Sequence, residues 1–173
     1  MITRRSVLAG MSGLTLLQLA GCSTVGIEPD LRFETRGRFT LVLTDLSGKR
    51  ENLSGKFSFK RTDAFSRLDL LTPLNSVLAR IELRDGTASF WRDLGDAPVS
   101  APDVETLMDR AVGFSMPVEA LEEWALASDA PKNYGWAIRV IKREAGRPKT
   151  LRAERRISRG SIRITIAFDE VFP

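Results

Sequence analysis

Hydrophobic and polar residues alternate through much of this chain. Phe33, Phe39 and Leu43 share one face of the segment 33–43, and Arg36 and Arg38 occupy the other. The same alternation recurs at residues 53–59, 68–70, 77–83 and 88–90. A period of two is typical of strands with one buried face, and Asp85-Gly86 between two of them favours a type I′ hairpin turn. The pattern therefore predicts an antiparallel meander.

The hydrophobic period changes to that of a helix between residues 102 and 126. Asp103 precedes an apolar stripe with helical spacing, which ends at Gly113. Pro117 begins a second expected helix, which carries Leu121 and Trp124 on one face. Strands return at residues 134–140, 151–157 and 162–168. We expect an α+β fold: a strongly curved antiparallel sheet, or unclosed β-barrel, with a two-helix lid over its concave face.

A sheet of this kind can hold an apolar cavity beneath its lid. The expected lining residues are those that the periods direct inward: Phe57, Phe59, Leu70, Phe90, Met108, Leu121, Trp124 and Trp136. Aromatic residues at such positions more often fill a core than line a pocket. The pattern alone leaves a filled core and an open cavity as alternatives.

The first 22 residues resemble the signal of a bacterial lipoprotein. Arg4 and Arg5 precede an apolar segment too short to span a bilayer, and the sequence Ala20-Gly21-Cys22 follows. We expect a signal peptide at 1–21, lipid attachment at Cys22, a tether at 22–30 and one domain at 31–173. An ordinary secretory signal with an incidental cysteine is the alternative. The paired arginines fit either the general or the twin-arginine export route. Ser23, in place of the aspartate typical of inner-membrane retention, resembles an outer-membrane address.

Composition excludes several classes of chemistry. The chain has no histidine and one cysteine, so catalytic triads with histidine, histidine metal sites and disulfides are excluded. Its formal net charge of +4 falls to +2 without Arg4 and Arg5, which does not indicate a nucleic-acid-binding protein. No phosphate-binding loop or nucleophile elbow is present after the signal. We expect a protein that is not an enzyme and needs no metal or cofactor beyond the lipid on Cys22.

Two surface features have more than one interpretation. Leu74 lies at a turn between Pro73 and Asn75, where polar residues are the norm. Its side chain either folds back onto the core or forms an exposed finger that enters a membrane. A basic run comprises Arg152, Arg155, Arg156, Arg159 and Arg163. It is either a solvated face or a contact for anionic headgroups or an acidic partner.

Local signatures across the mature chain are similar to the LolB family of outer-membrane lipoprotein receptors. They are Thr35-Arg36-Gly37, Arg67-Leu68, Thr72-Pro73-Leu74, residues 103–108, Met116-Pro117-Val118, residues 121–124, Gly135-Trp136-Ala137-Ile138 and Ile162-Arg163-Ile164. Asn75 replaces the glycine expected in the loop, but asparagine tolerates the left-handed conformation. The tether is also short for this family.

This resemblance implies a monomeric receptor anchored at the periplasmic face of the outer membrane of a Gram-negative bacterium. Its implied partners are a LolA-type periplasmic carrier, lipoprotein cargo and outer-membrane phospholipid. Pro73, Leu74 and Asn75 would form a membrane-insertion loop. Two rival functions remain: another lipid-binding or assembly lipoprotein of the envelope, and a lipid hydrolase that uses a serine with a lysine or aspartate.

Overall fold

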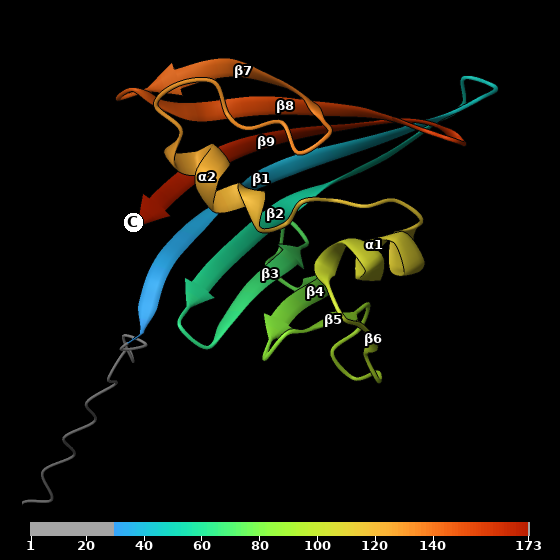
Figure 1. Cartoon of the computed structure of the whole chain (residues 1–173). Helices are drawn as coiled ribbons and strands as arrows, with labels where there is room; N and C mark the ends of the chain where they lie inside the picture. Colours follow the sequence, from blue (N-terminus) through green and yellow to red (C-terminus); the bar gives the residue numbers. More distant parts are fainter. Residues whose placement is uncertain (1–29, 173) are drawn as a thin grey trace, which may run out of the picture.

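A computed structural model describes residues 30–172, and the expected signal, the lipid-attachment residue Cys22 and nearly all of the tether lie outside them. The described residues form one sheet of nine antiparallel strands and two helices (Figure 1). The elements are β1 (Leu31–Asp45), β2 (Arg50–Thr62), β3 (Phe65–Leu71), β4 (Val77–Arg84), β5 (Thr87–Trp91), β6 (Val99–Ala101), α1 (Val104–Val112), α2 (Ala120–Leu126), β7 (Ala137–Glu144), β8 (Arg147–Ile157) and β9 (Gly160–Phe172).

The sheet is curved and open. Its strand order is β6-β5-β4-β3-β2-β1-β9-β8-β7, so the first strand pairs with the last and the helices are inserted between the two edge strands. β6 and β7 do not pair, which leaves the barrel unclosed. Both helices cover one face of the sheet (Figure 1). The expected α+β fold with an unclosed curved sheet and two helices is confirmed. No helix within residues 30–172 is long and apolar enough to cross a membrane.

Local sequence explains the turn between β4 and β5 and both ends of α1. Asp85 and Gly86 both have positive φ angles, 49° and 71°, as a type I′ turn requires. Asp103 caps α1 by accepting a hydrogen bond from the backbone N–H of Thr106 at 2.7 Å, and this bond lowers the pKa of its carboxyl group. Gly113 ends the helix in the left-handed conformation, with φ 82°. The expected first helix therefore has the expected ends.

Two expected boundaries are wrong. The second helix begins at Ala120 rather than at Pro117, because the intervening residues form a tighter turn in which the N–H of Ala120 bonds the carbonyl of Pro117. The strand expected from Tyr134 begins at Ala137. Tyr134 and Gly135 have φ angles of 46° and 78°, which place them in a turn. The alternation of apolar residues in the sequence therefore begins before the strand itself, which starts at Ala137.

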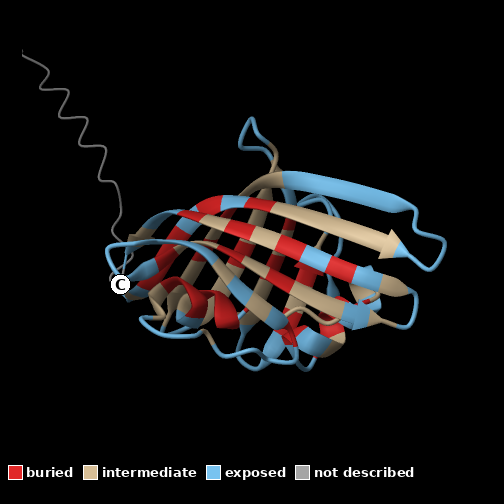
Figure 2. Cartoon of the chain, turned by 90° about the horizontal axis from the view of Figure 1, so that it is seen from above, coloured by how far each residue is buried: buried red, intermediate tan, exposed pale blue. Residues whose placement is uncertain are grey.

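The core lies between the concave face and the helices. Buried residues alternate with more exposed ones along parts of β1, β8 and β9, as expected (Figure 2). Phe33, Phe57, Phe59 and Phe168 are buried on the inner face, and Leu107 and Trp124 of the helices belong to the same core. Burial of each such side chain contributes about 1.5–3 kcal/mol.

Gly37 is the point where β1 bends past β9. The pairing shifts register between Arg36 and Gly37, and a Cβ atom on Gly37 would lie 2.0 Å from the carbonyl oxygen of Ala167. We expect Gly37→Ala to lower the free energy of unfolding by about 3 kcal/mol, because backbone must move to admit the methyl group. Gly48→Ala is the control: no atom lies within 4 Å of that position, so only its φ of 86° opposes alanine. Urea unfolding midpoints measure both, and equal midpoints would contradict the prediction.

Candidate functional site

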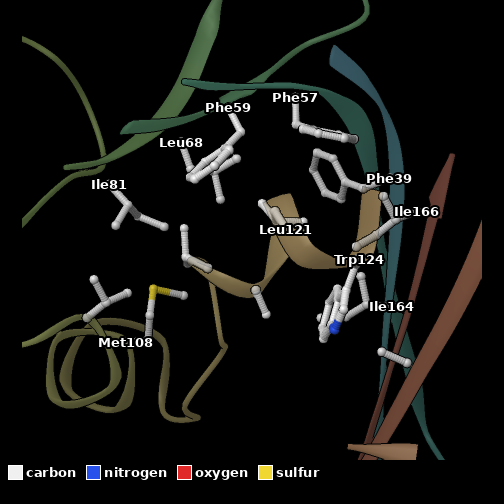
Figure 3. Packing of buried hydrophobic residues seen from close by; sticks show 14 of the residues in the cluster. Phe39, Phe57, Phe59, Leu68, Ile81, Met108, Leu121, Trp124, Ile164 and Ile166 are labelled. Carbon is white, nitrogen blue, oxygen red and sulfur yellow. The ribbon is translucent and has the colours of Figure 1, made fainter. Parts of the chain in front are cut away.

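An apolar cavity of about 410 Å³ lies between the concave face of the sheet and the two helices. Figure 3 shows side chains from α1, α2 and the strands facing one another around it; Met108 comes from α1, Leu121 and Trp124 from α2. Arg92 is the sole charged residue among those that border it. This volume is typical of small-molecule sites, and the lining suits a hydrocarbon ligand rather than a polar one.

Seven of the eight residues expected to line a cavity border this one. They are Phe57, Leu70, Phe90, Met108, Leu121, Trp124 and Trp136. Phe59 is the exception, because it does not border this cavity. It faces inward as its period predicts, but its ring packs 6.1 Å from that of Phe33 and is 0% exposed, so it belongs to the filled part of the core.

The mouth of the cavity lies among half-exposed aliphatic residues. Leu53 on β2, Leu78 on β4 and Val112 on α1 border the cavity and are 45%, 37% and 39% exposed. Sequence reasoning missed them as rim residues. The alternation at residues 53–59 places Leu53 on the inner face of the sheet. The structure adds that β3 pairs with β2 only from Lys56 onward. The edge of β2 beside Leu53 is therefore open at the mouth.

Polar contacts hold α2 over the cavity. The indole N–H of Trp124 donates to the carbonyl of Lys132 at 3.0 Å, and Arg61 pairs with Glu122 at 2.9 Å. The Tyr134 hydroxyl donates to Glu123, and this bond raises the pKa of Tyr134. The bond to Lys132 fixes the orientation of the Trp124 ring, and the ion pair with Arg61 ties α2 to β2.

Trp136 places a polar atom in the same wall. Its ring is 2% exposed, and its indole N–H has no hydrogen-bond partner within the described part of the chain. The guanidinium group of Arg155 lies 6.0 Å from the centre of the ring. A buried donor left unpaired costs about 1–3 kcal/mol, so Trp136 carries an uncompensated polar group in an otherwise apolar core.

Leu74 is 89% exposed at the turn between β3 and β4. The turn is ordered without it: the N–H of Thr72 donates to Ser76, and Asn75 adopts the left-handed conformation with φ 67°. Lys56 donates from Nζ to the side chain of Asn75 at 2.9 Å. The side chain of Leu74 is therefore exposed and does not fold back onto the core. The turn leads directly into Leu78 at the cavity mouth.

The basic run does not form one face. Arg155 is paired across the sheet with Ile162, which is buried, and it reaches Trp136 on the inner side. Arg152, Arg156 and Arg163 project from the convex face, and Arg159 donates to the carbonyl of Gly113 at 3.3 Å. Alternation along β8 separates neighbours that the sequence places together.

Comparisons with known proteins agree with one another. The family described as "Outer membrane lipoprotein LolB" matches residues 32–169. A protein of Cupriavidus metallidurans named outer-membrane lipoprotein LolB is 37% identical over 148 residues, 80% of this chain and 69% of the relative. A Bordetella pertussis protein of the same name is 30% identical over 165 residues, 82% of each chain. A third, from Bordetella petrii, is 34% identical over 127 residues, 69% of this chain and 63% of the relative.

Proposed function

The chain belongs to the LolB family of outer-membrane lipoproteins, and from this premise we propose that it accepts lipoproteins from a LolA-type periplasmic carrier and inserts them into the outer membrane. The observation that supports the proposal best is the apolar cavity of about 410 Å³ beneath the helices. Acyl chains of the cargo would occupy it during transfer.

The energetics of the acyl chains explain why such a cavity is needed. Each methylene removed from water contributes about 0.8 kcal/mol, so a lipoprotein cannot cross an aqueous compartment with its chains exposed. A receptor can take the chains from a carrier if it offers an apolar site at least as favourable. This exchange forms and breaks no covalent bond, so it requires neither a catalytic base nor a cofactor.

The position of Leu74 supports delivery as well as reception. Its turn continues into the strand that carries Leu78 at the cavity mouth. If Leu74 enters a bilayer, the mouth is brought to the surface of that bilayer. The acyl chains would then pass from the cavity into the membrane over Leu53 and Leu78, with little apolar surface exposed to water.

A transfer assay tests this function directly. The purified protein is mixed with a carrier loaded with a radiolabelled lipoprotein, and the label is followed to the receptor and then to added vesicles. The proposal requires the label to leave the carrier. Cargo that stays on the carrier while the protein still binds an acyl-chain fluorophore would favour the alternative, an envelope lipid-binding or assembly lipoprotein. Release of free fatty acid from the cargo would favour a hydrolase.

Attachment through Cys22 is a separate proposal. We expect Cys22→Ala to abolish acylation and membrane anchoring, because a thiol is the only group in the expected lipobox that can take the diacylglyceryl chain. The nine strands and both helices lie within residues 30–172, so the domain should still fold. Membrane fractionation and mass spectrometry of the mature N-terminus measure the result. Retention of the variant in the membrane fraction would show that another element anchors the protein.

A further inference from the structure

A row of four polar side chains crosses the convex face near the tips of two hairpins. Arg50 on β2 is paired with Thr44 on β1, Thr44 with Ser161 on β9, and Ser161 with Arg156 on β8. Residues directly opposite one another in antiparallel strands project from the same face. The order across the sheet is therefore arginine, threonine, serine, arginine. The β1–β2 and β8–β9 hairpins that carry the row reach the same end of the molecule (Figure 1).

The row faces away from the cavity. Leu43, next to Thr44, borders the cavity, and Ile162, next to Ser161, is 1% exposed in the core. Because successive side chains of a strand point to opposite faces, Thr44 and Ser161 point outward. All four members border a surface depression of about 430 Å³ that is distinct from the cavity.

The groups in this depression are available to a ligand. Within residues 30–172, neither Arg50 nor Arg156 has an ion pair, and neither hydroxyl of the row has a hydrogen-bond partner. Arg163 projects from the same face and also borders the depression. The single carboxylate there belongs to Glu154 and accepts from Nε of Arg163 at 2.6 Å.

This arrangement suits a phosphate ester. Guanidinium groups bind phosphate oxygens through paired N–H donors, and the two hydroxyls between them can donate to the remaining oxygens. Leu46, at the tip of the β1–β2 hairpin, is 83% exposed, so an apolar side chain lies at the end of the hairpin that carries Thr44 and Arg50. A cationic row beside an exposed leucine matches a bilayer, whose phosphates lie next to its apolar interior.

We propose that Arg50, Thr44, Ser161 and Arg156 bind the phosphodiester headgroup of an anionic phospholipid and dock this end of the sheet on the membrane. The proposal requires only that the chain lies at a membrane, as its family does, and it does not depend on cargo transfer. Docking would hold a lipid-anchored domain in one orientation rather than leave it free to rotate about its anchor.

The experiment uses the anchored full-length protein in vesicles without carrier or cargo. A fluorophore is attached to Ser158→Cys in the β8–β9 turn, and a quencher is carried on lipid headgroups. Vesicles contain phosphatidylglycerol or phosphatidylcholine alone. We expect quenching to be strong in the phosphatidylglycerol vesicles and to weaken with added salt. Each arginine should contribute about fivefold to the ratio of docked to free protein, so this ratio should fall about 25-fold in the double variant Arg50→Gln/Arg156→Gln.

Two further double variants separate the row from general electrostatic attraction. Arg110→Gln/Arg147→Gln removes the same charge from α1 and from the opposite end of β8, and it should change the ratio by about twofold or less. Thr44→Val/Ser161→Ala keeps every charge and should lower the ratio about fivefold through the lost hydroxyl donors. Valine retains the strand preference of threonine.

Four outcomes would overturn the proposal. The first is an equal loss of docking in Arg50→Gln/Arg156→Gln and in Arg110→Gln/Arg147→Gln. The second is normal docking of Thr44→Val/Ser161→Ala. Either result would mean that diffuse charge alone attracts the protein to the vesicle. The third is saturable calorimetric binding of inorganic phosphate without vesicles, which would indicate a site for soluble phosphate. The fourth is normal docking of Arg50→Gln/Arg156→Gln together with a loss of binding to the carrier, which would assign the row to a protein partner. A failed cargo-transfer assay leaves the docking result unchanged, because no cargo is present in it.

Discussion

Leu74→Glu should slow transfer of lipoprotein from the receptor into vesicles at least tenfold while leaving uptake from the carrier nearly unchanged. Leu74 is 89% exposed, so the substitution removes no packing from the folded domain. Full burial of a leucine in a bilayer is worth roughly 1.5–3 kcal/mol, and a carboxylate there opposes insertion. Since about 1.4 kcal/mol corresponds to a factor of ten, loss of that burial alone accounts for the expected change. The measurement is the rate at which labelled cargo moves from receptor to vesicle.

Leu94→Glu is the matched control for this experiment. Leu94 is 48% exposed in the loop between β5 and β6, so the variant adds the same charge at another exposed leucine. It should transfer cargo at the wild-type rate, and Leu74→Phe should retain activity because it keeps the apolar contact. Equal slowing in Leu74→Glu and Leu94→Glu would assign the effect to net charge. Wild-type transfer by Leu74→Glu would remove the membrane-finger role even though the family assignment stands.

Ala79→Phe should weaken binding of acyl-chain ligands strongly without unfolding the domain. Ala79 is 9% exposed on β4 and borders the cavity, so a phenyl group there would occupy space that hydrocarbon would otherwise fill. Filling an existing cavity adds packing contacts rather than strain. We expect affinity for an acyl-chain fluorophore to fall by about tenfold or more, with little change in the urea midpoint. Uptake of cargo should fall with it.

A second cavity variant should reduce both ligand binding and folding stability. Trp124→Asp places an unpaired carboxylate in the wall and removes the hydrogen bond to Lys132. It should abolish fluorophore binding, but at a cost of several kcal/mol in folding stability. Ala130→Phe, on an exposed loop, controls for the added ring and should bind normally. If the wild-type protein bound no acyl fluorophore at all, the cavity would have no lipid-binding role.

Much of this fold follows from local pattern because a half-buried strand and an amphipathic helix each repeat with their own period. The alternation from Phe33 to Leu43 and the aspartate–glycine pair at residues 85–86 were sufficient to predict strands and a hairpin turn. The predictions failed where a local pattern continued through a turn. Tyr134 alternates with Trp136 in the sequence, but positive φ angles at Tyr134 and Gly135 place this segment outside the sheet.

The candidate site, like the fold, could be predicted from the sequence only in part. The inward direction of Phe57, Leu70 and Trp124 follows from periodicity, since each side chain belongs to the apolar face of its own element. Whether those faces meet or leave a space depends on the curvature of the sheet and the height of the helices above it. For that reason the cavity itself, and the exclusion of Phe59 from it, came from the structure.

The linear order of residues therefore accounts for most of the strands, the first helix, the apolar inner face and the turn that carries Leu74, but not for the exposure of Leu74 or for β6. Tertiary structure decided which residues meet. The row of Arg50, Thr44, Ser161 and Arg156 joins four strands through the pairing of the first strand with the last, and no segment of the sequence contains it. Local elements arise from interactions between residues a few positions apart, whereas a cavity or a row across a sheet depends on the register and twist with which distant strands pair.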